Sequence, residues 1–252
     1  MKNIAVLGAG WLGTSLAKQL QETYVVKVST RSLEKQTKLQ QQGFNTFIVD
    51  LNLEDTYTND AFFINVDVLI VSLTPQPIEV FKKLIALVKK HGIKKVLLFS
   101  SIGVYAGLKG VVNETSALNT ENPKVTLLKS IEDVFLKNNY FNTTILRLGG
   151  LIGEDRHPVY HLAKKNVIED GNEPVNLIEK DAIIETIYKL LLKPFTSTVL
   201  NVVNNNHTTK EVFYTQAANQ LNLTLPVFKH NEIPHNRIVS NEKLERFLNK
   251  KS

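Results

Sequence analysis

The sequence predicts an α/β protein built on a doubly wound parallel sheet, with a small lobe at its C-terminal end. Two observations carry this prediction. Apolar runs suited to buried strands alternate with amphipathic segments suited to helices through the first half of the chain. A glycine-rich turn, Gly8-Ala9-Gly10-Trp11-Leu12-Gly13, separates the first of these strands from the first helix.

The expected elements follow one another in strand–helix order. Strands are predicted at residues 2–7, 24–29, 44–49, 66–73, 95–100 and 143–148. Helices are predicted at residues 11–21, 78–90 and 127–138, where apolar side chains recur at helical spacing. A polar helix is predicted at residues 32–42, because Ser32 can serve as its N-cap. The strand at 95–100 is almost continuously apolar, as expected when both faces of a sheet are covered. Strands joined through helices must lie parallel, because each connection crosses over the sheet.

Beyond Gly149 the alternation loosens. Residues 155–176 are polar and carry glycine and proline, which favours a loop or a small helical insert. A helix at 181–192, a strand at 197–203 and a helix at 209–221 follow. We therefore expect a first domain over residues 1–150 and a small lobe over residues 151–252. The lobe should share its core with the first domain, and the elements near 181–203 should pack back on the sheet.

The composition excludes several kinds of site and partner. The 252 residues include no cysteine, which excludes disulfides, thiolate metal sites and cysteine nucleophiles. No histidine spacing resembles a zinc site, so no metal is expected. The net charge of +6 is spread over separated lysine pairs, which argues against a nucleic-acid partner. No run reaches the roughly 18 apolar residues of a membrane helix, so we expect a cytoplasmic protein without a membrane partner.

The glycine-rich turn has the spacing G-x-G-x-x-G at a strand–helix junction, which is typical of a Rossmann dinucleotide-binding domain. Gly8 permits the tight turn, Gly10 lets the backbone approach a pyrophosphate, and Gly13 lets the helix pack closely on the strand. The pyrophosphate would lie at the helix N-terminus, beside the N–H groups of Trp11 and Leu12. The alternative is a plain strand–helix turn without a ligand.

The end of the second strand predicts which dinucleotide binds. An NAD site places an acidic residue there for the ribose diol, whereas this chain has Thr30 followed by Arg31. A guanidinium suits a 2′-phosphate, so we expect NADP(H), with NAD as the alternative cofactor. The alternative for Arg31 is an exposed arginine in an ordinary turn. Asp50 and Leu51 end the third strand and could reach the adenine, or Asp50 could cap a turn.

Residues that follow the fourth and fifth strands complete the expected site, because parallel sheets bind ligands at the carboxyl ends of their strands. Leu73, Thr74 and Pro75 follow the fourth strand and would run beside the cofactor. Ser100 and Ser101 end the fifth strand, where a hydroxyl could donate a hydrogen bond to a substrate carbonyl. Serines that merely cap a turn are the alternative.

Several motifs together resemble the extended short-chain dehydrogenase/reductase family, the NAD-dependent epimerase/dehydratase group. The resemblance spans nearly the whole chain. It rests on the glycine-rich turn, on Ser100-Ser101-x-x-Val104-Tyr105, on 144–148 with Gly150 and Gly153, on a degraded hinge at 176–182, and on the closing segment 236–244.

This resemblance implies site residues by matching position. Ser101 takes the place of the serine that polarises the substrate, and Lys129 takes the place of the lysine that holds the nicotinamide ribose. The family's proton-exchanging tyrosine falls on Val125, and a valine side chain cannot transfer a proton. The chain therefore resembles an atypical branch that lacks this tyrosine. Lys129 could also be an ordinary lysine on a helix surface.

Three other side chains could supply a proton in place of the tyrosine. Tyr105 is near in sequence, although the resemblance implies a packing role for it. His157 and His161 lie in the variable segment near the expected substrate position, and histidine titrates near neutrality. Surface histidines are the commoner interpretation of both.

The leading functional hypothesis is an NADP(H)-dependent oxidoreductase or epimerase/dehydratase-like enzyme. It would act on a small or sugar-nucleotide-like molecule without the usual tyrosine, and it could assemble as a homodimer. The rival is a non-catalytic NADP(H)-binding sensor or regulatory protein, which the missing tyrosine favours, whereas Ser101 and Lys129 favour the enzyme. A small imine or keto reductase is a third hypothesis, weakened by the paired serines after the fifth strand.

Overall fold

A computed structural model describes residues 2–53, 60–224 and 227–250, which form two compact units. Unit 1 comprises residues 1–100, 126–146 and 194–199, and unit 2 comprises residues 101–125, 147–193 and 200–252. The chain thus passes between the units several times. The domain boundary expected near residue 150 stays a prediction.

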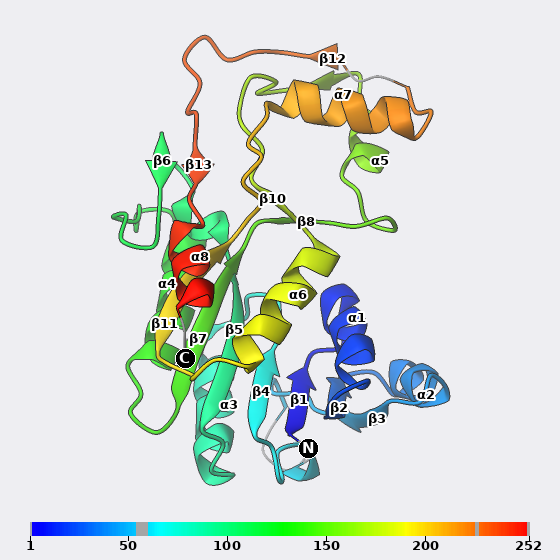
Figure 1. Ribbon diagram of the computed structural model, residues 1–252, viewed down its shortest axis with the longest axis vertical. Coiled ribbons are helices and arrows are strands. Elements are labelled where there is room, and N and C mark those ends of the chain that lie inside the picture. The colour runs from blue at the N-terminus through cyan, green and yellow to red at the C-terminus, as the bar shows by residue number, and fades with distance from the viewer. Residues whose placement is uncertain (1, 54–59, 225–226, 251–252) are drawn as a thin grey trace. The chain divides into compact units, whose positions relative to one another are not determined.

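Unit 1 is built on a seven-stranded sheet with the order β11-β7-β5-β4-β1-β2-β3 (Figure 1). The pairs β1–β2, β2–β3, β1–β4 and β4–β5 are all parallel. The strand bounds are β1 Asn3–Leu7, β2 Val25–Thr30, β3 Asn45–Ile48, β4 Val68–Val71, β5 Lys95–Ser101, β7 Asn142–Leu148 and β11 Thr198–Val202. The predicted Rossmann-type α/β fold is therefore confirmed.

Four helices connect these strands. They are α1 Trp11–Leu20, α2 Leu33–Gln41, α3 Ile78–Lys90 and α4 Pro123–Leu136, with a short 3-10 turn at Asp60–Phe62. Alternate strand residues such as Leu69, Val71 and Val96 share one core with apolar residues of α3 and α4. The intervening residues, among them Val68 and Ile70, are equally buried. Both faces of the central strands are covered, which explains why these strands are apolar throughout.

The element bounds differ from the sequence expectation mainly at α4. This helix begins at Pro123 rather than at residue 127. Proline is favoured at the first position of a helix because its fixed φ suits that position and its missing N–H costs nothing there. The N-cap expected at Ser32 is confirmed, since its hydroxyl accepts a hydrogen bond from the backbone N–H of Lys35 at 3.3 Å.

Unit 2 consists of short elements around a small core of its own. Its helices are α5 Val159–Leu162, α6 Lys180–Leu191, α7 Lys210–Gln220 and α8 Glu242–Asn249, with a 3-10 turn at Ile102–Tyr105. Its strands pair in twos: β8 Gly150–Ile152 with β10 Leu177–Glu179, β9 Val167–Ile168 with β12 Val227–Phe228, and β6 Val111–Val112 with β13 Ile238–Val239. The expected small helical insert at 155–176 corresponds to α5. Val159, Val175 and Ala218 are among the residues that form the core.

None of the helices in the described part of the chain has the length and apolar character that crossing a bilayer requires.

Candidate functional site

The strand order of unit 1 places a ligand cavity beside the glycine-rich turn. The chain continues from β1 to β2 on one side, and β4 lies on the other side of β1, so the order reverses at this point. Open parallel sheets bind ligands at the carboxyl ends of the strands that flank such a reversal. A cavity of about 350 Å³ lies there, lined by residues that follow β1, β2, β3 and β4. We call it the glycine pocket.

Two glycines of the turn are required by close packing. Gly8 has φ +103°, and a Cβ on it would lie 2.6 Å from the backbone oxygen of Ser72. A Cβ on Gly13 would lie 2.2 Å from the backbone oxygen of Gly8. Neither distance is compatible with a side chain, so the turn and α1 approach each other as the sequence predicted.

Gly10 has a different role, because a Cβ placed on it would meet no atom within 4 Å. This residue is the N-cap of α1, with φ −74°, and no side chain caps the helix. The first N–H groups of a helix have no partner inside the helix and favour an anion. Open space above an uncapped helix N-terminus fits the pyrophosphate of a dinucleotide.

The charged residues that line the glycine pocket are basic. Arg31 and Lys35 both line it, together with the capping Ser32 and the largely buried Thr30. No aspartate or glutamate is among the described residues that line it. The described lining of the pocket therefore carries net positive charge.

The predicted cofactor residues divide into two groups. Those that line the glycine pocket are Gly8, Gly10, Thr30, Arg31, Leu51, Leu73 and Thr74. Those outside its lining are Trp11, Leu12, Gly13, Asp50, Pro75 and Lys129. The Asp50 carboxylate accepts hydrogen bonds from the N–H and side-chain amide of Asn52, both at 3.0 Å, and so caps a turn.

Sequence reasoning missed Lys35, Asn52 and Gln76, which also line the pocket. The signal for Lys35 was present, because it lies four residues after Arg31 and one turn into the helix that Ser32 caps.

The two predicted catalytic residues lie in different units. Ser101, in unit 2, accepts a hydrogen bond from the N–H of Gly103 at 3.0 Å and caps the following 3-10 turn. Lys129, in unit 1, forms an ion pair with Asp133 at 2.5 Å. Val125 precedes Lys129 by one turn of α4 and is fully buried. A catalytic role for Ser101 or Lys129 stays a prediction.

A buried carboxylate near the end of β5 was not anticipated. Glu132 is only 1% exposed, and the hydroxyl of Ser100 donates a hydrogen bond to it at 2.6 Å. Both residues belong to unit 1. Asp133 directly follows Glu132, so only the helical spacing of Glu132 from the apolar residues Leu128 and Phe135 could have indicated its burial.

Tyr105 is fully buried within unit 2 and holds several segments together. Its hydroxyl donates to Asn201 at 2.8 Å and accepts a hydrogen bond from Arg147 at 2.8 Å. The Arg237 guanidinium donates to its backbone oxygen at 2.9 Å. Burial raises the pKa of the Tyr105 phenol. The hydroxyl is therefore committed to structure, as the family resemblance implied.

The two candidate histidines differ in environment. His161 is exposed, whereas His157 lines a cavity within unit 2 and stacks on Phe213 with ring centroids 5.6 Å apart. The Nδ1 atom of His157 accepts a hydrogen bond from the N–H of Val159 at 3.2 Å. Burial lowers the pKa of His157, which favours the neutral ring.

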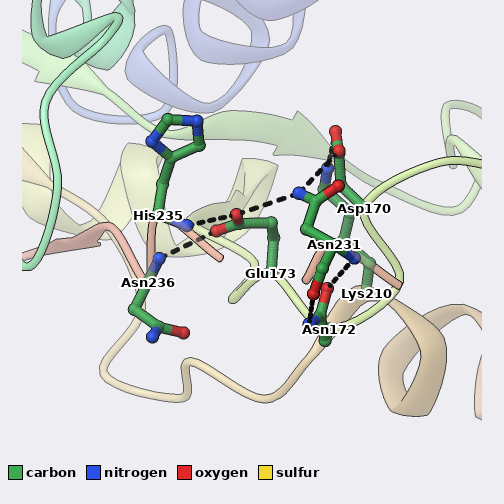
Figure 2. Close-up of polar contacts among 7 residues, drawn as sticks. All are labelled: Asp170, Asn172, Glu173, Lys210, Asn231, His235 and Asn236. Atoms are coloured by element: carbon green, nitrogen blue, oxygen red, sulfur yellow. Dashed lines mark hydrogen bonds and ion pairs between the residues drawn. The ribbon is translucent and has the colours of Figure 1, made fainter. Parts of the chain in front are cut away.

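A polar network anchors the C-terminal segment of unit 2 (Figure 2). The buried carboxylate of Glu173 accepts hydrogen bonds from the backbone N–H groups of His235 and Asn236, at 2.5 and 3.0 Å. The Asn231 side chain donates to Asp170 at 2.9 Å, and this contact lowers the pKa of Asp170. The network positions backbone rather than leaving an unsatisfied group for a ligand.

The fold and the glycine pocket together define a dinucleotide-binding protein. A family model described as NAD(P)H-binding matches residues 8–194, and the chain belongs to that family.

Among curated proteins, the chain is 28% identical to Protein YeeZ of Escherichia coli K12 over 241 residues, covering 91% of this chain and 88% of YeeZ. Two solved structures share its fold. A conserved protein of unknown function from Silicibacter pomeroyi matches with a TM-score of 0.81 at 17% identity, covering 100% of this chain and 94% of that one. The UDP-glucuronic acid 4-epimerase of Bacillus cereus in complex with NAD matches with a TM-score of 0.78 at 17% identity, covering 98% and 90%.

Proposed function

We propose that this chain binds NADP(H) in preference to NAD(H) and acts as an oxidoreductase or epimerase-like enzyme on a small molecule. The observation that carries the proposal is the charge of the glycine pocket, which Arg31 and Lys35 line and in which no described lining residue is acidic. Membership of the NAD(P)H-binding family supports dinucleotide binding in general, and the pocket supports the choice of NADP(H).

The chain's own residues would divide the binding task. The N-terminus of α1 faces the pyrophosphate across Gly10, and Arg31 and Lys35 neutralise the 2′-phosphate. Leu51 and Leu73 supply apolar walls for the adenosine half. The bound nicotinamide supplies hydride-transfer chemistry. The hydroxyl of Ser101 would orient a substrate carbonyl group by donating a hydrogen bond to its oxygen.

A second candidate function, a non-catalytic NADP(H)-binding sensor, is favoured by one observation. By the sequence resemblance, the tyrosine position of the short-chain dehydrogenase/reductase family falls on Val125, which is fully buried and carries no exchangeable proton. The hydroxyl of Tyr105, another candidate proton donor, already donates a hydrogen bond to Asn201 and accepts one from Arg147.

Calorimetry on the full chain tests the cofactor proposal. NADPH should bind about 10- to 150-fold more tightly than NADH, because a charge-assisted hydrogen bond contributes roughly 1.5–3 kcal/mol. The Arg31→Ala variant should lose most of this preference. Lys38→Ala is the matched control, because Lys38 lies on α2, the helix that follows Arg31, pairs with Glu34 and does not line the pocket. Equal affinities in the wild-type protein would overturn the proposal. The sensor is distinguished by turnover: it would bind NADPH and never oxidise it with any carbonyl substrate.

A further inference from the structure

Unit 2 contains a cavity of about 600 Å³ that is separate from the glycine pocket. It lies between the turn that follows β8, the start of α6, and one face of α7. All of its lining residues belong to unit 2. The volume is in the range of pockets that hold small organic molecules.

One wall of this cavity is aromatic. The rings of His157 and Phe213 stack at 5.6 Å with an interplanar angle of 14°, and Tyr160 of α5 also lines the cavity. Because Nδ1 of His157 accepts the N–H of Val159, the neutral ring carries its proton on Nε2. Nε2 has no hydrogen-bond partner among the described residues. Such a wall suits a planar ring or an organic cation.

The residues that line the cavity carry a net negative charge. Glu154, Glu179 and Asp181 line it, against the single cation Lys180. Lys180 is partly compensated by Asp155, whose carboxylate lies 3.5 Å from its Nζ. A diphosphate would meet net repulsion here, whereas a cation would be attracted. The glycine pocket has the opposite character, because Arg31 and Lys35 line it.

We propose that the unit 2 cavity is a binding site for a planar organic cation, an aromatic or heterocyclic amine, and not for a nucleoside diphosphate. The aromatic wall receives the ring and the carboxylates receive the ammonium group. The proposal goes beyond cofactor binding and does not depend on it, because the two cavities share no residue.

Three indoles of similar size and different charge test the site: tryptamine, tryptophol and indole-3-acetate, with UDP as a fourth probe. Binding to the full chain is measured by calorimetry, and the imidazole resonances of His157 report its location. We expect tryptamine to bind at least about tenfold more tightly than indole-3-acetate, and tryptophol to have an intermediate affinity. The difference in affinity between tryptamine and indole-3-acetate should become smaller at high salt, because the carboxylates that line the cavity are accessible to solvent. Indole-3-acetate or UDP binding here as tightly as tryptamine, or no probe shifting His157 at millimolar concentration, would overturn the proposal.

Matched variants locate the selectivity. The double substitution of Glu154→Gln with Asp181→Asn should reduce the preference for tryptamine over indole-3-acetate about tenfold. Glu185→Gln is the control, because Glu185 is an exposed carboxylate of α6 that pairs with Lys189 at 2.7 Å and lies outside the cavity. An equal loss in the control would show that net charge alone sets the preference and would refute the site.

NADPH affinity, measured on the same samples, separates the two proposals. Loss of tryptamine selectivity with NADPH binding intact concerns only the cavity of unit 2. Failure of NADPH binding with tryptamine selectivity intact would contradict only the proposed cofactor.

Discussion

Gly13 lies against the backbone oxygen of Gly8, so close that a Cβ on Gly13 would be 2.2 Å from that oxygen. One turn earlier, Gly10 has open space where its Cβ would be. Close packing thus requires glycine at Gly13, whereas packing places no such demand on Gly10.

Alanine substitutions should separate these two roles. Gly13→Ala should destabilise the protein by about 1–3 kcal/mol or more, because the backbone must shift to admit the methyl group. Gly10→Ala should cost less than about 1 kcal/mol of stability, because its φ of −74° suits alanine although glycine is the better N-cap, and it should weaken NADPH binding. Urea denaturation and calorimetry measure the two effects. Unchanged NADPH affinity in a folded Gly10→Ala protein would show that the pyrophosphate does not lie over this residue.

A second prediction concerns the missing tyrosine. We expect the wild-type protein to turn over ordinary sugar nucleotides weakly or not at all, because a positioned acid–base group typically contributes about 10²–10⁴-fold. Val125→Tyr would place a phenol one helical turn from Lys129 and should raise turnover above that of Val125→Phe. Both variants add volume at a buried site and should cost about 1–3 kcal/mol of stability. An ordinary wild-type rate of about 1–10³ per second would contradict this account.

Tyr105 should prove structural rather than catalytic. Tyr105→Phe removes a buried hydroxyl that bonds to both Asn201 and Arg147, and it should cost about 1–3 kcal/mol in the free energy of unfolding. Cofactor affinity should stay unchanged. Tyr140→Phe, at a position 60% exposed, is the matched control and should change stability by less than about 0.5 kcal/mol. A Tyr105→Phe protein of normal stability that had lost activity would assign the proton to Tyr105 after all.

His157 should contribute a pH dependence to stability. Burial lowers its folded pKa below the unfolded value, so the unfolded state takes up a proton first as the pH falls. The stability of the wild-type protein should therefore decrease as the pH falls below about 6.5, and this contribution should level off below the folded pKa. His157→Asn, whose side-chain oxygen can still accept the N–H of Val159, should lack this contribution. The comparison is made against His161→Asn, which alters an exposed ring. Parallel curves for wild type and His157→Asn would refute the prediction.

Most of unit 1 could be predicted from the sequence, because its elements are long enough for their periodicity to be read. The helix expected at 78–90 corresponds to α3 at Ile78–Lys90. The glycine turn could be interpreted because each glycine has a distinct steric reason. Thr30 and Arg31 could also be predicted to line the pocket, because they lie at the end of β2.

The rest depends on contacts between segments that are remote in sequence. Strands such as β6 and β13 have two residues each, too few to show any alternation. The hydrogen bond that Glu132 accepts from Ser100 joins α4 to β5, 32 residues apart in sequence. The unit 2 cavity brings His157 together with α7 and the start of α6, and no local pattern in the sequence encodes that meeting.

A pair of cofactor fragments tests most directly whether the glycine pocket binds the 2′-phosphate of NADP(H). Adenosine 2′,5′-bisphosphate and adenosine 5′-monophosphate differ only by that phosphate, so the ratio of their dissociation constants isolates its contribution. Arg31 and Lys35 predict that the bisphosphate binds about 10- to 150-fold more tightly to the wild-type chain. They also predict that the ratio falls toward one when both residues are replaced by alanine. Equal dissociation constants for the two fragments in the wild-type protein would contradict the account.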